Sequence, residues 1–178
     1  FAKYLLENSP NKISITRDAF RSLEDVRTVE SIQNETAKLP NNPNKWYPET
    51  EFLYIRNKDI FFAAKGGFNN ESHNHNDIGT FILYKDKQPM FIDAGVGTYN
   101  KKTFSKERYD IWTMQSDYHN LPQINGYEQP FGAKYKSKNA SFDGKTNEFK
   151  LDIAGAYPEE ANINSWVRKY KINNNELI

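Results

Sequence analysis

The sequence predicts a mainly β protein: an antiparallel β-sandwich that is part of a larger super-sandwich, with a short N-terminal helical segment. Three observations support this prediction. After residue 50, apolar residues alternate with a period of two, which is the spacing of a strand with one buried face. Most connections between these segments are short, which favours antiparallel pairing over a parallel sheet with helical crossovers. Aromatic residues form 15% of the chain, and pleated sheets pack such side chains well.

The first 50 residues predict a helix followed by a linker. Residues 1–33 carry a helix-like pattern with Asp18 as an N-cap, and we interpret them as the remainder of a helical domain. Residues 34–50 are polar and contain three prolines, which predicts a linker at a domain boundary. Because the chain starts within the helical pattern, we expect that it was cut from a longer protein.

Residues 51–178 predict the β-sandwich domain, in which strands follow one another across short turns. Asn57-Lys58-Asp59 and Lys85-Asp86-Lys87 predict two hairpin turns, and Asn125-Gly126 predicts a tight turn further along. Residues 105–112 carry a helical pattern between strands. The predicted strands share apolar residues at strand spacing and turn residues at their ends, and they span residues 52–55, 60–64, 78–84, 90–92 and 166–172.

Composition and charge exclude several classes of function. Lys and Arg number 24 against 23 Asp and Glu, a net charge of +1, so no global field favours nucleic acid or an anionic membrane. The absence of cysteine removes disulfides, thiolate zinc sites and thiol nucleophiles. No apolar run is long enough for a membrane span, which takes about 18 residues, and the first residues lack the pattern of a secretion signal.

The three histidines of the chain gather around a short polar run. His73 and His75 lie in the run from His73 to Asp77, and Asp93 and His119 follow it. So few imidazoles, two of them one residue apart and beside carboxylates, indicate a metal site or a proton-transfer site. An extended backbone would point His73 and His75 to one side, because side chains repeat every two residues. Asp77 or an asparagine of the run can hold the outer nitrogen of a ligand histidine.

The spacing sets a condition on a shared ion. Folding the hairpin about Asp86-Lys87 brings Asp93 opposite Thr80. His75 and Asp93 can share an ion only if residues 73–77 curl back, since an extended run would keep them roughly 16 Å apart. Two imidazoles and one carboxylate then suit zinc, whereas calcium would require more carboxylates. The alternative is that the histidines are hydrogen-bonded loop residues that bind no metal.

Three separated blocks, in order, resemble the heparinase II/III family of polysaccharide lyases. They are residues 71–81 (ESHNHNDIGTF), 91–99 (FIDAGVGTY) and 118–120 (YHN). The resemblance is close over residues 50 to 130 and looser elsewhere. It implies a helical toroid followed by an antiparallel β-sandwich, of which this chain resembles the start of the sandwich with a residual helix of the toroid.

The resemblance also implies an activity. Family lyases cleave uronic-acid-containing polysaccharides, heparin- or heparan-sulfate-like or alginate-like, by β-elimination. It implies that His73 is the catalytic histidine facing the uronate. It implies a metal, zinc rather than calcium, whose ligands are His75, Asp93 and His119. Because the principal base of the family comes from the toroid, which is missing here, we expect the chain alone to show little or no turnover.

Weaker expectations concern the surroundings of this cluster. Tyr99 and Arg108 lie near it in sequence, so we expect them to contact a sugar or an acidic group. Lysines at positions 85, 87, 101, 102 and 106 could attract an acidic chain, although a solvated loop is the simpler interpretation. The expected partners are an acidic polysaccharide and the missing toroid domain, and by family analogy the location is periplasmic or secreted.

Two other functions remain open at this point. The first is a non-catalytic carbohydrate-binding β-sandwich in which the cation is only structural and aromatic side chains hold the glycan. The second is a cupin-like metal enzyme that uses the same three ligands for redox chemistry, which would prefer iron and an open coordination position.

Overall fold

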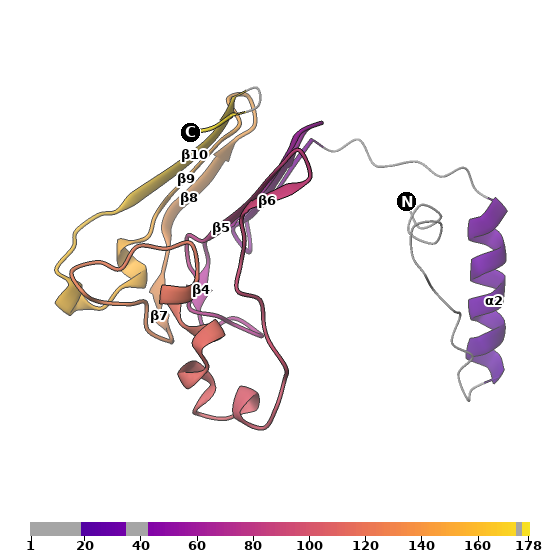
Figure 1. Ribbon diagram of the computed structural model, residues 1–178, viewed down its shortest axis with the longest axis horizontal. Coiled ribbons are helices and arrows are strands. Elements are labelled where there is room, and N and C mark those ends of the chain that lie inside the picture. The colour runs from indigo at the N-terminus through magenta and orange to yellow at the C-terminus, as the bar shows by residue number, and fades with distance from the viewer. Residues whose placement is uncertain (1–18, 35–42, 174–175) are drawn as a thin grey trace. The chain divides into compact units, whose positions relative to one another are not determined.

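The structure is a computed structural model that describes residues 19–34, 43–173 and 176–178 (Figure 1). The chain divides into two units, Phe1–Asn42 and Pro43–Ile178. In the first unit, helix α2 spans Ala19–Asn34, which confirms the predicted helical segment over this range. The predicted cap at Asp18 and the first part of the helical pattern lie outside the described residues.

The second unit begins with a five-stranded antiparallel sheet in the order β1-β2-β3-β5-β6. Its first strand, β1, lies inside the range predicted to be a linker and pairs with β2, so ordered structure starts earlier than the prolines indicated. The partner strand determines this, because Trp46 lies opposite Leu53 in the register. The strands are β1 (Asn44–Tyr47), β2 (Phe52–Arg56), β3 (Ile60–Lys65), β5 (Phe81–Lys85) and β6 (Gln88–Phe91).

A four-stranded sheet in the order β11-β10-β9-β8 faces the first one (Figure 1). A short pair, β4 with β7, lies beside the site described below. All pairings in these sheets are antiparallel, which confirms the predicted sandwich. The strands are β4 (Phe68–Asn69), β7 (Gly132–Lys136), β8 (Lys138–Asp143), β9 (Glu148–Asp152), β10 (Val167–Asn173) and β11 (Glu176–Leu177).

The hydrophobic core lies between the two large sheets. Leu53 and Phe62 from the first sheet and Phe149 and Leu151 from the second have no exposed surface. The Phe62 ring packs 5.2 Å from the Tyr170 ring, centroid to centroid, across the two sheets. Each such side chain stabilises the fold by roughly 1.5–3 kcal/mol relative to its exposed state. The period of two in the sequence therefore marks the inward faces of the strands.

Both predicted hairpins are present, and the second differs in register. Asp86 and Lys87 have positive φ angles of 51° and 65°, as a two-residue hairpin turn with strand-compatible twist requires. Lys85 pairs with Gln88, but a bulge after Tyr84 makes Leu83 pair with Phe91. Beyond this bulge the register is one residue away from the prediction that Asp93 lies opposite Thr80.

The segment predicted to be helical over residues 105–112 forms short 3₁₀ turns. Ile111 N–H donates to the Arg108 carbonyl, a three-residue spacing, and Ile111 itself is extended with ψ of 120°. The extended Ile111 ends one turn and precedes the next, which interrupts a continuous α-helix. The turns are η1 (Lys102–Phe104), η2 (Arg108–Asp110), η3 (Trp112–Met114) and η4 (Ser116–Tyr118), with η5 (Ala154–Ala156) and η6 (Glu159–Ala161) later in the chain.

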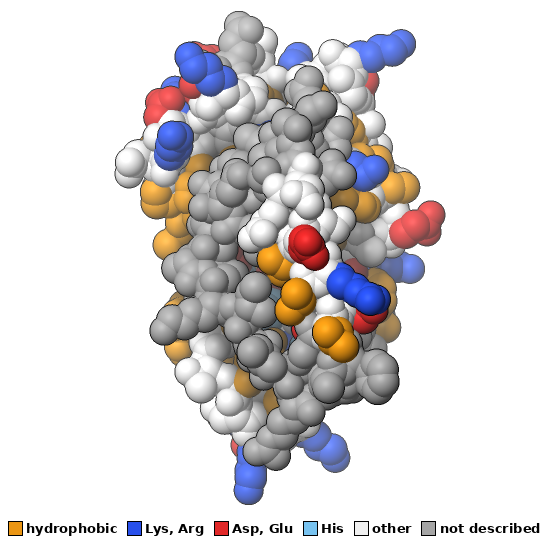
Figure 2. All heavy atoms as spheres, turned by 90° about the vertical axis from the view of Figure 1, so that its right-hand side faces the viewer, with side chains coloured by type: hydrophobic (Ala, Val, Ile, Leu, Met, Phe, Trp, Pro, Cys, Tyr) orange, Lys and Arg blue, Asp and Glu red, His pale blue; other side chains and the backbone are white. Residues whose placement is uncertain are grey.

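The surface carries mixed charge. Figure 2 shows basic and acidic side chains of described residues interspersed on the visible face, without a field of one sign. This agrees with the net charge of +1. Among the described residues, no helix has the length and apolar character needed to cross a membrane.

Candidate metal centre and histidine pocket

The loop between β4 and β5 carries two of the three histidines, and it curls as a shared ion requires. Asn74 N–H donates to the Glu71 carbonyl at 3.2 Å, and Thr80 N–H donates to the Asp77 carbonyl at 3.0 Å. His73 has a φ angle of 57°, a left-handed conformation within the turn that the first of these bonds closes. As a result His75 is buried whereas His73 is exposed.

Two distant segments complete a three-residue cluster with His75. Asp93 follows strand β6 and His119 follows turn η4. One donor atom from each of the three side chains lies within 4.8 Å of the other two. Asp93 Oδ2 and His119 Nδ1 are 2.7 Å apart, and the His75 and His119 ring centroids are 5.4 Å apart. The curl of the loop and the segment after β6 therefore bring together the residues that the sequence singled out.

The donor set fits a divalent cation. Two imidazole nitrogens and a carboxylate oxygen are ligands that zinc accepts at about 2.0–2.2 Å. His119 Nε2 is buried without a hydrogen-bond partner, and a buried polar atom without a partner is costly. The cluster can therefore hold a metal, while the donor types alone leave its identity open.

Burial and hydrogen bonding shift the pKa values of the cluster in different directions. Burial lowers the pKa of His75, and this outweighs the opposing charge of Asp77. Burial also acts to lower the pKa of His119, but the hydrogen bond with Asp93 and the charge of Asp77 raise it overall. Burial would raise the pKa of Asp93, but hydrogen bonds from His119 and the Gly95 N–H lower it overall. His75 is thus held neutral, the form in which an imidazole binds a cation.

Asn120 connects the segment that carries His119 to the segment that carries Asp93. Its Nδ2 donates to the Phe81 carbonyl at 2.8 Å and to the Ile92 carbonyl at 2.9 Å. One amide therefore ties the start of β5 to the residue before Asp93, and it follows His119 directly in the chain. Groups around the ligands that set their position commonly affect metal affinity.

Replacing Asn120 with alanine is expected to lower the free energy of unfolding by about 1–2 kcal/mol, because two carbonyls lose their donor. We also expect about tenfold weaker metal binding, since Asp93 is less firmly placed. Denaturant unfolding and zinc titration by calorimetry measure the two effects. Gln123→Ala, at an exposed position nearby, is the control, and equal metal affinity in both variants would contradict this role.

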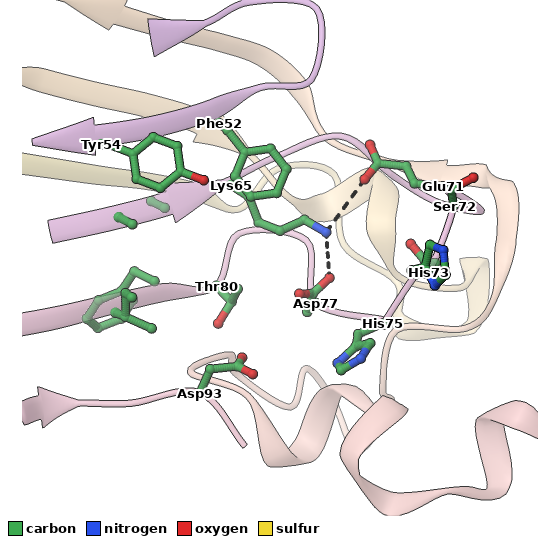
Figure 3. Close-up of a pocket in the computed structure, with 15 residues that line it drawn as sticks. Phe52, Tyr54, Lys65, Glu71, Ser72, His73, His75, Asp77, Thr80 and Asp93 are labelled. Carbon is green, nitrogen blue, oxygen red and sulfur yellow. Dashed lines mark hydrogen bonds and ion pairs between the residues drawn. The ribbon is translucent and has the colours of Figure 1, made fainter. Parts of the chain in front are cut away.

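His73 and His75 border a pocket of about 400 Å³, which a buried lysine also lines (Figure 3). His73, His75 and Asp93 all line this pocket. Lys65 Nζ lies 2.7 Å from Asp77 Oδ1 and 3.7 Å from Glu71 Oε2. Asp77, which the sequence suggested as a partner for a ligand histidine, is thus paired with Lys65.

Lys65 therefore ties strand β3 to both ends of the histidine loop. The side chains of Lys65 and Asp77 are only 10% and 13% exposed, and removing one partner of a buried pair leaves the other uncompensated. We expect Lys65→Met to lower the free energy of unfolding by about 3 kcal/mol.

Denaturant unfolding tests this expectation, with Lys58→Met in an exposed hairpin turn as the matched control. The double variant Lys65→Met with Asp77→Leu should recover part of the loss, because no unpaired charge is then buried. A single variant as stable as the control would show that the ion pair does not hold the loop.

The two residues predicted to contact substrate have different surroundings. The Tyr99 ring stacks on the His73 ring with centroids 6.4 Å apart and an interplanar angle of 15°. Arg108 donates from Nε and Nη2 to the Asn74 carbonyl and from Nη1 to the Thr103 carbonyl. Arg108 therefore supports the histidine loop, and its contact with substrate stays a prediction.

Sequence reasoning missed the residues that position the loop. Gln129 is buried, donates to the Ile78 carbonyl at 2.8 Å and accepts from the Ile78 N–H at 3.0 Å, so it closes the end of the loop. Lys65 was also missed. Neither residue carries a local signal, because its partner is more than ten positions away in the chain, whereas Asn120 lies in the third family-like block.

Comparison with known proteins agrees with the fold and the order of these segments. A family described as "Heparinase II/III-like, C-terminal" matches residues 39–167. The crystal structure of a heparinase III aligns with 89% of this chain and 27% of its own, with a TM-score of 0.56 and 21% identity. A heparan sulfate lyase from Pedobacter heparinus aligns with 85% of this chain and 24% of its own, with a TM-score of 0.55 and 19% identity.

The matched structures are longer than this chain, and the similarity concerns one part of them. The chain spans about a quarter of the length of the solved structures that it matches. At these identities the structural likeness concerns the fold. No curated protein matches the chain.

Proposed function

Because this chain belongs to the heparinase II/III-like family, whose C-terminal domain it contains, we propose that it works as part of a polysaccharide lyase. The proposed reaction is β-elimination of a uronic-acid-containing polysaccharide. The observation that carries the proposal is the arrangement of the histidines: exposed His73 shares a pocket with buried His75 and half-buried Asp93, and His119 completes this donor set.

The chemistry of the proposed reaction requires a group that faces the uronate carboxylate. A base removes the proton at C5, the electron pair forms the C4=C5 double bond, and the C4 oxygen leaves with a proton. Negative charge develops on the carboxylate before the C–O bond breaks. Positioned hydrogen-bond donors or cations at such a charge typically supply several kcal/mol of stabilisation.

His73 is the residue of this chain that is suited to that role. It is exposed at the pocket, and its ring is oriented by stacking on Tyr99. An exposed imidazole can donate a hydrogen bond to a bound substrate or exchange a proton with it. We propose that His73 faces the uronate, while the principal base belongs to a helical domain outside this chain.

The other two histidines serve the structure of the site in this proposal. His75, Asp93 and His119 would hold a zinc ion, which supplies positive charge that neutralises Asp93 and holds the two loops together. Lys65 orients the histidine loop through its ion pair with Asp77, and Asn120 holds the start of β5 through a hydrogen bond. The ligand residues therefore position His73 rather than react with substrate.

The substrate class and location follow the same proposal. A solved structure with this fold is described as a heparan sulfate lyase, so we propose a heparan-sulfate-like chain, with alginate as the alternative uronate polymer. A polymeric glycan is met outside the cytoplasm, so we propose a periplasmic or secreted enzyme.

The ultraviolet absorbance of unsaturated uronate products tests the function. With heparin, heparan sulfate or alginate, we expect a protein that joins this chain to its helical domain to release such products, and this chain alone to release few or none. Rapid release by the chain alone would contradict the proposed position of the base. No release from any of the three polymers by the longer protein would contradict the lyase function.

A further inference from the structure

Positive charge is concentrated in one segment beside the histidine pocket. Residues 101–108 contain four cations and one anion, Glu107, a net charge of +3, although the whole chain carries only +1. Within the described part of the chain, Lys101 and Lys106 are exposed and make no ion pair, whereas Lys102 is half-buried and lies 3.5 Å from Asp110. Lys101 and Lys106 hence keep their charge available for a ligand.

An exposed aromatic ring lies among these cations. Phe104 is 71% exposed, the largest exposure among the large hydrophobic residues of the described chain. Its ring meets the Tyr99 ring edge to face, with centroids 5.6 Å apart and an interplanar angle of 82°. Tyr99 in turn stacks on His73. A row of three rings therefore leads from the histidine to the basic segment.

His73 lies between two hollows of different charge. A cavity of about 600 Å³ on the side of Phe104 is lined by His73, by two cations, Lys106 and Arg108, and by one carboxylate, Glu71, which it shares with the metal-side pocket. A neighbouring hollow is lined by Lys101, Lys102 and Lys106 with Glu107. The pocket on the metal side contains three carboxylates, and its lysine is already paired. An acidic ligand is therefore favoured on the Phe104 side.

We propose that residues 99–106 form a binding site for an acidic saccharide unit adjacent to the unit at His73. A sugar ring packs on Phe104, and sulfate or carboxylate groups are received by Lys101, Lys102 and Lys106. Lysine is a suitable partner for such groups because its ammonium acts as a point charge on a flexible stem. The proposal rests on the proposed function, since the neighbouring unit at His73 is the one proposed to react.

Charge distinguishes this ligand from another protein segment as the occupant. An exposed phenyl ring alone would suit an apolar partner. A ring surrounded by three lysines suits a ligand that is apolar on one face and anionic at its edges, which describes a sulfated or uronate sugar. The simpler interpretation of these lysines as a solvated loop leaves the exposure of Phe104 and its contact with Tyr99 without a role.

Calorimetric binding of a heparin hexasaccharide to the 178-residue chain tests the site. The loop variant Lys101→Ser, Lys102→Ser, Lys106→Ser is expected to bind about tenfold more weakly, because it loses three surface charge contacts that are each weak. The matched control Lys58→Ser, Lys87→Ser, Lys145→Ser removes the same charge from exposed hairpin turns and should bind within about twofold of the wild type. Phe104→Ala, which keeps all charges, should also weaken binding.

Each outcome decides the proposal. Equal weakening in the loop and control variants would overturn it, because binding would then follow net charge alone. Absence of hexasaccharide binding by the wild-type chain would also overturn it, as would unchanged binding in the loop variant. Binding by this chain needs no turnover. If the loop variant loses binding but the longer protein releases no unsaturated products, the lyase function is refuted and this site stands. If the longer protein releases products but the loop variant binds as tightly as the wild type, only this site is refuted.

Discussion

Replacing His73 with alanine is expected to slow the release of unsaturated uronate by about 10²–10⁴-fold, the usual contribution of a positioned proton-transfer group. The effect should fall on kcat, because His73 is proposed to act where charge develops on the carboxylate rather than to bind the polymer as a whole. The measurement requires the longer protein, in which this chain is joined to the helical domain.

The fold and the metal site should not change in this variant. His73 is exposed and none of its ring atoms belongs to the metal-competent group, so zinc affinity and thermal unfolding should match the wild type. Ser72→Ala is the matched control, because Ser72 is exposed, borders the same pocket and precedes His73 in the loop. An unchanged rate in His73→Ala would support a carbohydrate-binding function in place of catalysis.

Zinc is expected to stabilise the chain, and His119→Ala is expected to remove this effect. At a free zinc concentration of 1,000 times Kd, binding to the folded state alone contributes about 4 kcal/mol. For a chain of this size, that raises Tm by roughly 8–16 °C. Loss of one of three protein ligands should weaken zinc binding at least about a hundredfold, beyond the usual effect of residues that only support ligands.

Differential scanning calorimetry with and without zinc, and after chelation, measures this prediction. His73→Ala provides the control, since it removes an imidazole from the same loop but leaves the three donors in place. A zinc-induced shift of equal size in His119→Ala would refute the proposed ligand set. Metal analysis of the purified protein adds a second result: iron in place of zinc would favour the redox alternative.

The elements that follow local pattern could be predicted from the sequence. The alternation over residues 52–55 and 60–64 gave strands β2 and β3 with the turn between them, because neighbouring side chains of a strand point to opposite faces. The histidine run also singled out three side chains, His75, Asp93 and His119, that the structure brings together as a group able to hold a metal.

Other features depended on partners far along the chain. Strand β1 lies in a proline-rich segment and forms because β2 is beside it. The helical pattern over 105–112 breaks into 3₁₀ turns, and Arg108 is drawn to the carbonyls of Asn74 and Thr103. The bulge after Tyr84 shifts the register that a simple hairpin would give.

The sequence by itself determined the sandwich, its main hairpins and the chemical types at the site. The tertiary structure decided that His75, Asp93 and His119 meet, that Lys65 pairs with Asp77, and that His73 remains exposed between two hollows. The physical reason is range: periodicity and turn preference act over a few residues. The geometry of the site arises from hydrogen bonds and ion pairs that join segments 12 to 51 positions apart.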